Sequence, residues 1–162
     1  ALGRRDDFFL LIAGHGGGPE TERLRELLSP MAAAGMARLH PYVEGEGLRS
    51  LYWAADAYVS VATDEGGPAS VMKALACGLP VISTQVGETA DALAACGAGR
   101  LVPAGDHSAW LRAIEEALSG RFPAAMPASE ARERYDWRNV AARYIKLFSD
   151  LELRYYGGAD AG

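Results

Sequence analysis

The sequence predicts a doubly wound α/β fold, in which a parallel β-sheet carries helices on both faces. Short apolar runs alternate with helical patterns along the 162 residues, which is the order expected of β-α units. The runs are almost continuously hydrophobic, as in strands that are covered on both faces. Gly, Pro, Asp or Ser residues flank each run and supply the turns.

Five runs are predicted to be strands: residues 8–13, 37–43, 57–62, 80–84 and 100–102. Helices are predicted at residues 20–34, 46–55, 69–77, 88–96 and 107–118. The last of these has the strongest signals. Apolar residues recur at helical spacing from Trp110 to Leu118, Asp106 or Ser108 can cap the start, and Gly120 follows the end.

A further helix is predicted near the C-terminus, after Pro123 and Pro127. Its apolar stripe predicts that it packs on the rest of the domain; the stripe consists of Trp137, Val140, Ala141, Tyr144, Phe148 and Leu151. We therefore expect one domain over residues 1–156. Residues 157–162 have no apolar anchor and are expected to form a frayed tail.

Composition excludes several classes of protein. Hydrophobic residues make up 49% and charged residues 23%, which is typical of a globular chain. The net charge of −5 and the scattered basic residues argue against a nucleic-acid surface. Cys77 and Cys96 are interpreted as buried thiols, which favours a reducing, cytoplasmic location. No signal peptide or transmembrane segment is recognisable, and the missing initiator methionine suggests a fragment.

Ligands of such folds bind beyond the carboxyl ends of the strands, so the loop after residues 57–62 is the strongest site candidate. There Glu65, Gly66 and Gly67 precede Pro68 and a predicted helix. The glycines allow close backbone approach, and the helix start offers unpaired amides, so an anion such as phosphate fits. An ordinary strand-to-helix turn explains this segment equally well when it is considered alone.

Several segments together carry a family resemblance. They read Ala-Asp-Ala-Tyr-Val-Ser-Val-Ala (55–62), Glu-Gly-Gly-Pro (65–68), Lys-Ala-Leu-Ala-Cys-Gly-Leu-Pro-Val-Ile-Ser-Thr (73–84) and Val-Gly (86–87). Matching pieces recur at 10–14, 40–43, 101–106 and 135–137. The chain resembles the C-terminal, donor-binding domain of retaining GT-B glycosyltransferases of the group-1 family, which includes glycogen synthase-like and mannosyltransferase-like enzymes. The resemblance implies a Rossmann-like domain.

The resemblance also implies roles for individual residues. In the family, two glutamates eight positions apart contact the donor sugar and the ribose of its nucleotide. Glu65 matches the first and is the expected catalytic residue, whereas Lys73 stands at the second. A lysine only donates hydrogen bonds, so it cannot accept from ribose hydroxyls. Three alternatives remain open: the ribose is held by other groups, the lysine contacts a phosphate, or this protein no longer binds the usual donor.

Further donor contacts follow from the same resemblance. Backbone around Gly66, Gly67, Pro68, Ala69 and Ser70 is expected at the sugar and pyrophosphate. The backbone near Tyr42 and Val43 is expected at the nucleobase, and Gly14, His15 and Gly87 would line neighbouring loops. The substrate would be a nucleoside-diphosphate sugar, with no other cofactor and no metal required.

Other motifs are weak. The Gly-His-Gly-Gly-Gly-Pro segment at 14–19 has proline where a dinucleotide fingerprint needs its third glycine, so an NAD site is not expected. His15, His40 and His107 lack metal-ligand spacing, and no nucleophile elbow occurs.

The family resemblance implies that two parts are missing. One is the central strand that would precede residue 8, and the other is the acceptor-binding N-terminal domain. Transfer by this chain alone is therefore not expected. An unfilled centre would leave strand edges unpaired, so we expect either direct pairing of strands 8–13 and 57–62 or a partner chain, through a dimer or strand exchange.

The preferred function is donor binding for transfer of a hexose from a nucleoside-diphosphate sugar to a hydroxyl acceptor. A sugar-nucleotide 2-epimerase is one alternative. A non-catalytic nucleotide-sugar-binding or scaffold module is another, which Lys73 supports. The nucleobase, the sugar and the acceptor do not follow from the sequence.

Overall fold

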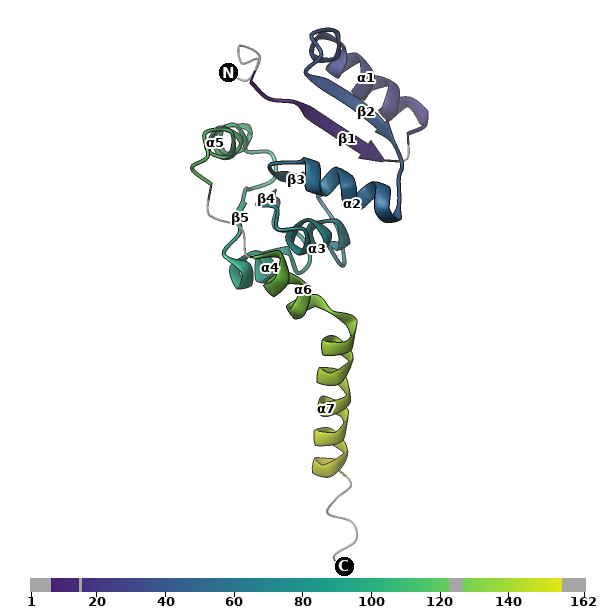
Figure 1. Ribbon diagram of the computed structural model, residues 1–162, viewed down its shortest axis with the longest axis vertical. Coiled ribbons are helices and arrows are strands. Elements are labelled where there is room, and N and C mark those ends of the chain that lie inside the picture. The colour runs from purple at the N-terminus through teal and green to yellow at the C-terminus, as the bar shows by residue number, and fades with distance from the viewer. Residues whose placement is uncertain (1–6, 15, 123–126, 156–162) are drawn as a thin grey trace, which may run out of the picture.

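The computed structural model describes residues 7–14, 16–122 and 127–155. Five strands alternate with helices, as the sequence predicts (Figure 1). The strands are β1 (Leu10–Gly14), β2 (Ala37–Pro41), β3 (Tyr58–Ser60), β4 (Val81–Ser83) and β5 (Gly99–Leu101). The helices are α1 (Gly18–Ala33), α2 (Gly45–Ala54), α3 (Ala69–Ala76), α4 (Thr89–Cys96), α5 (His107–Leu118), α6 (Ala128–Tyr135) and α7 (Trp137–Tyr155).

Helix α5 has the predicted bounds because its start and end signals are both used. The Asp106 carboxylate accepts a hydrogen bond from the Ala109 amide at 2.9 Å, which makes Asp106 and not Ser108 the cap. Gly120 follows with a φ of 68°, a left-handed conformation that glycine adopts without strain.

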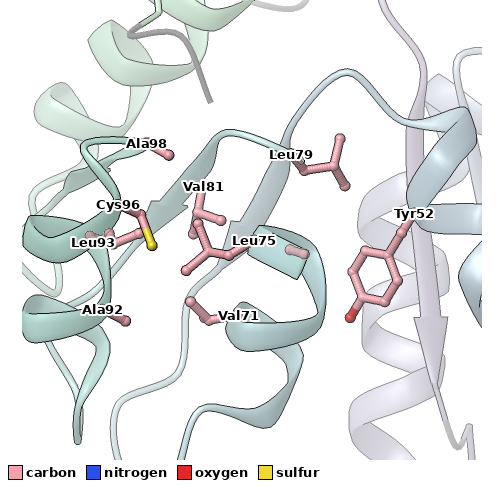
Figure 2. Packing of buried hydrophobic residues seen from close by; sticks show 10 residues of the cluster. Tyr52, Val71, Leu75, Leu79, Val81, Ala92, Leu93, Cys96 and Ala98 are labelled. Atoms are coloured by element: carbon pink, nitrogen blue, oxygen red, sulfur yellow. The ribbon is translucent and has the colours of Figure 1, made fainter. Parts of the chain in front are cut away.

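Strands β3, β4 and β5 form one parallel sheet in that order, with helices on both faces. Consecutive residues of β4 point to opposite faces. Val81 lies in the core formed with α3 and α4, shown in Figure 2, whereas Ile82 packs with Val102 and Ala113 beneath α5. The predicted doubly wound arrangement is therefore confirmed for this part of the chain.

Strands β1 and β2 form a separate parallel pair, in which Leu10 faces Ala37. The expected direct pairing of the first and third strands is wrong, because β1 and β3 share no sheet. In a parallel ladder, alternate residues turn their amides to opposite sides. The Leu10 amide donates to Met36 on the β2 side at 2.8 Å, so the Leu11 amide faces the other edge.

The same geometry leaves an open edge on β3. The Tyr58 amide donates to the Pro80 carbonyl at 2.9 Å, so the backbone of Val59 faces away from β4. Side chains near both edges are exposed, with 37% of Leu11 and 39% of Val59 accessible. The sheet is therefore interrupted where the family resemblance places a strand from outside this chain.

The C-terminal part contains two helices instead of the predicted one. Helix α6 packs on the body, where Arg132 and Arg134 donate to the carbonyls of Ala76 and Ala95 at 3.3 and 2.7 Å. These cationic groups lie at the C-terminal ends of α3 and α4, where they interact favourably with the helix dipoles. Extended backbone at Asp136 then redirects the chain, and α7 projects away from the body (Figure 1).

The expected packing of α7 on the domain is therefore wrong, since none of its residues is buried. The expected tail at residues 157–162 lies outside the described residues. Both cysteines are free thiols; Cys96 is buried and Cys77 is half-buried. Within the described ranges, no helix combines the length and the apolar character that a membrane crossing requires.

Candidate functional site

The loop from β3 to α3 carries the main candidate residues. Glu65 is half-buried, Gly66 and Gly67 are exposed, and Pro68 is buried just before the first turn of α3. Proline has no amide to lose at this position, and its fixed φ suits a helix start. An exposed glycine pair therefore stands directly before the start of α3, and the buried Pro68 holds that helix start in place.

The first turn of α3 has one amide available for an anion. The Ala69 amide donates to the Gly67 carbonyl at 2.7 Å, and the Met72 amide to the Pro68 carbonyl at 3.0 Å. Among the described residues, the amides of Ser70 and Val71 have no protein acceptor, but Val71 is fully buried and Ser70 is partly exposed. The predicted contribution of Ala69 is thus occupied in this conformation, while the neighbouring Ser70 amide remains open.

Gly87, in the loop after β4, touches this turn. Its φ is 48°, and a Cβ atom at this position would lie 2.5 Å from the Glu65 carbonyl oxygen and 2.8 Å from that of Gly66. Only glycine tolerates both the conformation and the close approach. The structure thereby brings together two predicted site positions that are more than twenty residues apart in sequence.

Two threonines lie near the loops that form this contact. The Thr84 hydroxyl donates to the Ala62 carbonyl, which ties the end of β4 to the loop after β3. Thr89, at the start of α4, is fully buried, and its hydroxyl is the one buried side-chain polar atom without a hydrogen-bond partner among the described residues. Thr84 therefore braces the loop after β3, whereas the Thr89 hydroxyl contributes no hydrogen bond.

Helix α3 is anchored from behind by α2. The Tyr52 hydroxyl donates to the Ser70 carbonyl at 3.1 Å, and its ring packs in the core cluster of Figure 2. Burial raises the pKa of Tyr52 above its ordinary value, so the hydroxyl stays protonated and remains a donor. This bond orients the peptide group that follows Ser70.

Lys73 is exposed on α3, one helical turn after Ser70. Residues three positions apart on a helix are neighbours on its surface. The ammonium group can therefore reach a ligand that sits at the start of α3. This position suits contact with an anionic group, which a glutamate in the same place would repel.

The remaining predicted positions follow the other strand pair. Gly14 ends β1, while Tyr42 and Val43 come directly after β2. The Tyr42 hydroxyl donates to the Glu44 carboxylate, which raises the pKa of Tyr42. These positions belong to the sheet that is separate from β3, so no shared hydrogen-bonded sheet joins them to Glu65. His15 lies outside the described residues.

One contributor was missed by sequence reasoning. The bracing hydroxyl of Thr84 had no signal in the sequence, because its partner comes from another loop. In the part of the chain that is described, no three His, Cys, Asp or Glu side chains gather as a metal site would need.

Comparison with known proteins identifies the family of this chain. Residues 2–137 match the family model described as glycosyl transferases group 1. The D-inositol 3-phosphate glycosyltransferase of Corynebacterium urealyticum is 31% identical over 88% of this chain and 35% of its own length. The phosphatidyl-myo-inositol mannosyltransferase of Mycobacterium leprae is 31% identical over 90% of this chain and 39% of its own length.

Solved structures support the same fold. The sucrose-phosphate synthase from Thermosynechococcus elongatus matches with a TM-score of 0.71 and 26% identity, over 88% of this chain and 38% of its own. The pneumococcal O-GlcNAc transferase GtfA, solved with UDP and GlcNAc, has a TM-score of 0.68 at 24% identity, over 88% and 29% of the two chains. The chain thus spans about a third of the length of these relatives. It belongs to the group 1 glycosyl transferases, with their GT-B, Rossmann-like architecture.

Proposed function

We propose that this chain is the donor-binding domain of a glycosyltransferase that moves a hexose from a nucleoside-diphosphate sugar to a hydroxyl acceptor. The observation that carries the proposal is the first turn of α3, where the Ser70 amide has no protein acceptor and lies beside the exposed Gly66–Gly67 pair. An open amide at a helix start, together with the helix dipole, favours the negative charge of a diphosphate, which grows as the sugar leaves.

Glu65 supplies the second element of the proposed site. Its half-buried carboxylate stands directly before the glycine pair, and a carboxylate accepts hydrogen bonds from sugar hydroxyls. The chemistry required of the protein is positioning and charge stabilisation, with no protein nucleophile. The acceptor site belongs to a part of the protein beyond this chain, so we expect no transfer by these 162 residues alone.

Lys73 favours a second candidate, a scaffold module that has lost donor binding. The two readings differ in what the ammonium group does. If the ammonium group contacts a phosphate, the site still binds a donor. If the lysine only removes a ribose contact, donor binding is weakened or lost. The cytoplasmic location stays a prediction.

Calorimetric titration separates these readings. The chain is titrated with UDP, GDP and ADP and with the matching nucleoside-diphosphate hexoses. We expect one nucleotide to bind and its hexose derivative to bind more tightly. Glu65→Ala should then weaken the derivative about tenfold, the value of one charged hydrogen bond, and leave the bare nucleotide unchanged.

Lys73→Glu tests the phosphate contact, with Lys146→Glu on α7 as the charge-matched control. A loss of affinity in the first variant and none in the second is expected. A gain of affinity in Lys73→Glu would identify the lysine as a lesion. Absence of binding by every nucleotide, in a folded chain, would overturn the donor-binding proposal and favour the scaffold.

A further inference from the structure

Helix α6 lies against the C-terminal ends of α3 and α4, the two helices whose opposite ends border the candidate site (Figure 1). Arg132 donates a hydrogen bond to the carbonyl of Ala76, in the last turn of α3. Arg134 donates in the same way to the carbonyl of Ala95, in the last turn of α4. The candidate site lies at the start of α3 and in the loop directly before α4, so one short helix holds both site helices by their remote ends.

The two arginines reach different helices because they point to different sides of α6. Positions two residues apart on a helix are separated by about 200° around its axis. The Arg134 Nη1 atom lies 2.7 Å from the Ala95 oxygen, a distance typical of a hydrogen bond from a charged donor. The Arg132 Nε atom lies 3.3 Å from the Ala76 oxygen, so Arg134 makes the stronger of the two links.

In the part of the chain that the structure describes, no hydrogen bond joins α3 to α4 directly. The two helices meet through apolar side chains instead, with Val71 and Leu75 of α3 and Ala92 and Leu93 of α4 in one cluster (Figure 2). Burial of apolar surface is non-directional, so it specifies the relative position of two helices less sharply than directional bonds do. The two arginine links to α6 supply such bonds.

Helix α6 is itself held in place at its end and along one face. Carbonyls in the last turn of a helix have no partner inside it. In α6 the Glu133 carbonyl accepts from the Asn139 amide group, and the Arg134 carbonyl accepts from the Arg143 guanidinium group, both at 2.7 Å. Tyr135 packs against the apolar cluster that α3 and α4 share. The arginines are thus carried by a well-anchored helix.

The contact between the two site loops leaves little room for movement of α3 against α4. A Cβ atom on Gly87, before α4, would lie 2.5 Å from the carbonyl oxygen of Glu65, before α3. A displacement of about 1 Å is enough to weaken a site whose groups must converge on one ligand. A shift at the far ends of the two helices would therefore alter how Glu65 and the Ser70 amide stand relative to Gly87.

We propose that Arg132 and Arg134 are positioning residues of the donor site. They contact no ligand. By holding α3 and α4 on one helix, they set the position of Glu65 and the start of α3 relative to Gly87. The inference rests on the proposed function for its ligand, a nucleoside-diphosphate sugar, whereas the order of the two loops is measurable without any ligand.

Amide hydrogen exchange without ligand measures how firmly the two loops are held. The amides of Ala69 and Thr89 report on them, because each donates to a loop carbonyl, at 2.7 and 3.0 Å. Arg134→Met keeps the aliphatic stem but loses the donor and the charge, so both amides should exchange about three- to tenfold faster. Arg112→Met is the control, because Arg112 is exposed on α5 and has no partner among the described residues; it should leave both rates unchanged.

Calorimetry with the nucleotide that the unaltered chain binds tests the effect on the site. Arg134→Met should lower the affinity about fivefold and Arg132→Met about twofold, because the Arg132 link is longer. Arg134→Lys should restore the affinity to within about twofold, since an ammonium group still donates to the Ala95 carbonyl. Arg134→Met combined with Gly87→Ala should lose less than the product of the two separate effects, because both act on one loop contact.

Three results would each overturn the proposal. The first is unchanged exchange and unchanged affinity in Arg134→Met, and the second is a lysine variant that loses as much as the methionine variant, as a role in packing alone requires. The third is a pair of effects, from Arg134→Met and Gly87→Ala, that simply multiply. If the folded, unaltered chain binds no nucleotide, the donor-binding proposal fails, and the exchange rates alone decide whether the arginines hold the loops. Circular dichroism verifies that each variant is folded.

Discussion

Replacing Gly87 by alanine probes the loop contact on which the candidate site depends. The new methyl group would lie 2.5 Å from the Glu65 carbonyl oxygen and 2.8 Å from that of Gly66, in a residue with a φ of 48°. Both contacts are with backbone, which cannot rotate away as a side chain can. The loop that carries Glu65 must therefore move, or the loop after β4 must.

The control is Gly97→Ala, at the end of α4. Gly97 has a φ of 60°, but no atom lies within 4 Å of its Cβ position. Left-handed strain alone should cost about 1–2 kcal/mol there. Gly87→Ala should cost about 2–5 kcal/mol, because overpacking adds about 1–3 kcal/mol to the same strain. At about 2–4 °C per kcal/mol, the Tm should fall by about 5 °C in the control and about 10 °C in Gly87→Ala.

Two assays decide the outcome. Thermal melts compare the Tm of the two variants with that of the unaltered chain. Calorimetry compares their affinities for the nucleotide that the unaltered chain binds. We expect Gly87→Ala to lose about tenfold in affinity, or about 1.4 kcal/mol, and Gly97→Ala to keep it. Equal melting and equal binding of the two variants would refute the contact between the loops after β3 and β4.

Three further predictions concern the scaffold. Asp106→Ala should cost about 1 kcal/mol of unfolding free energy in urea titration, because the α5 cap is lost, whereas Ser108→Ala should change it by less than about 0.5 kcal/mol. Thr89→Val should stabilise the chain by about 1 kcal/mol, because the variant removes a buried hydroxyl without a partner; a destabilised variant would contradict this. Burial and the neighbouring Cys96 thiol raise the pKa of Tyr135 to about 12. The protonated Tyr135 hydroxyl therefore contributes its full stability below pH 10, and this contribution is lost as the pH rises toward 12. In melts between pH 9 and 11.5, the Tm of Tyr135→Phe should fall less steeply with pH than that of the unaltered chain.

Local signals predicted the elements well where several of them agreed. Periodicity, the Asp106 cap and Gly120 all point to one helix, and α5 has the expected bounds. Strand lengths were less predictable. The apolar run at 57–62 became a strand of only three residues, and β4, which is paired on both sides, is equally short, so apolar runs do not fix how far the pairing extends.

Features that depend on absent neighbours could not be predicted from local patterns. The apolar stripe on α7 predicted packing on the domain, which is wrong, since the pattern alone does not tell which surface, if any, covers it. The cost of open edges led us to expect either pairing of β1 with β3 or a partner chain. The structure excludes the first alternative, because the two strands belong to separate sheets, and the second stays a prediction.

The candidate site was predictable in its chemistry and less so in its contacts. Glu65, the glycine pair and the helix start follow from turn rules and helix geometry. The approach of Gly87 to Glu65 is a tertiary contact between loops of adjacent strands. The order of the strands places the loops after β3 and β4 at the same edge of the sheet. Only the structure shows that they approach so closely at Gly87 that no side chain fits there.

The division of the sheet bears directly on how the site would work. Glu65, Ser70 and Gly87 belong to the loops and helix starts around β3 and β4, a unit with a core of its own. Gly14 and Tyr42 follow the β1–β2 pair. A nucleotide sugar that contacts both groups would link two units that share no sheet hydrogen bonds. Binding should therefore protect amides in both units, since a bridging ligand stabilises each unit that it contacts. Hydrogen exchange with and without nucleotide measures this protection, and protection confined to the β3–β5 unit would show that the ligand contacts that unit alone.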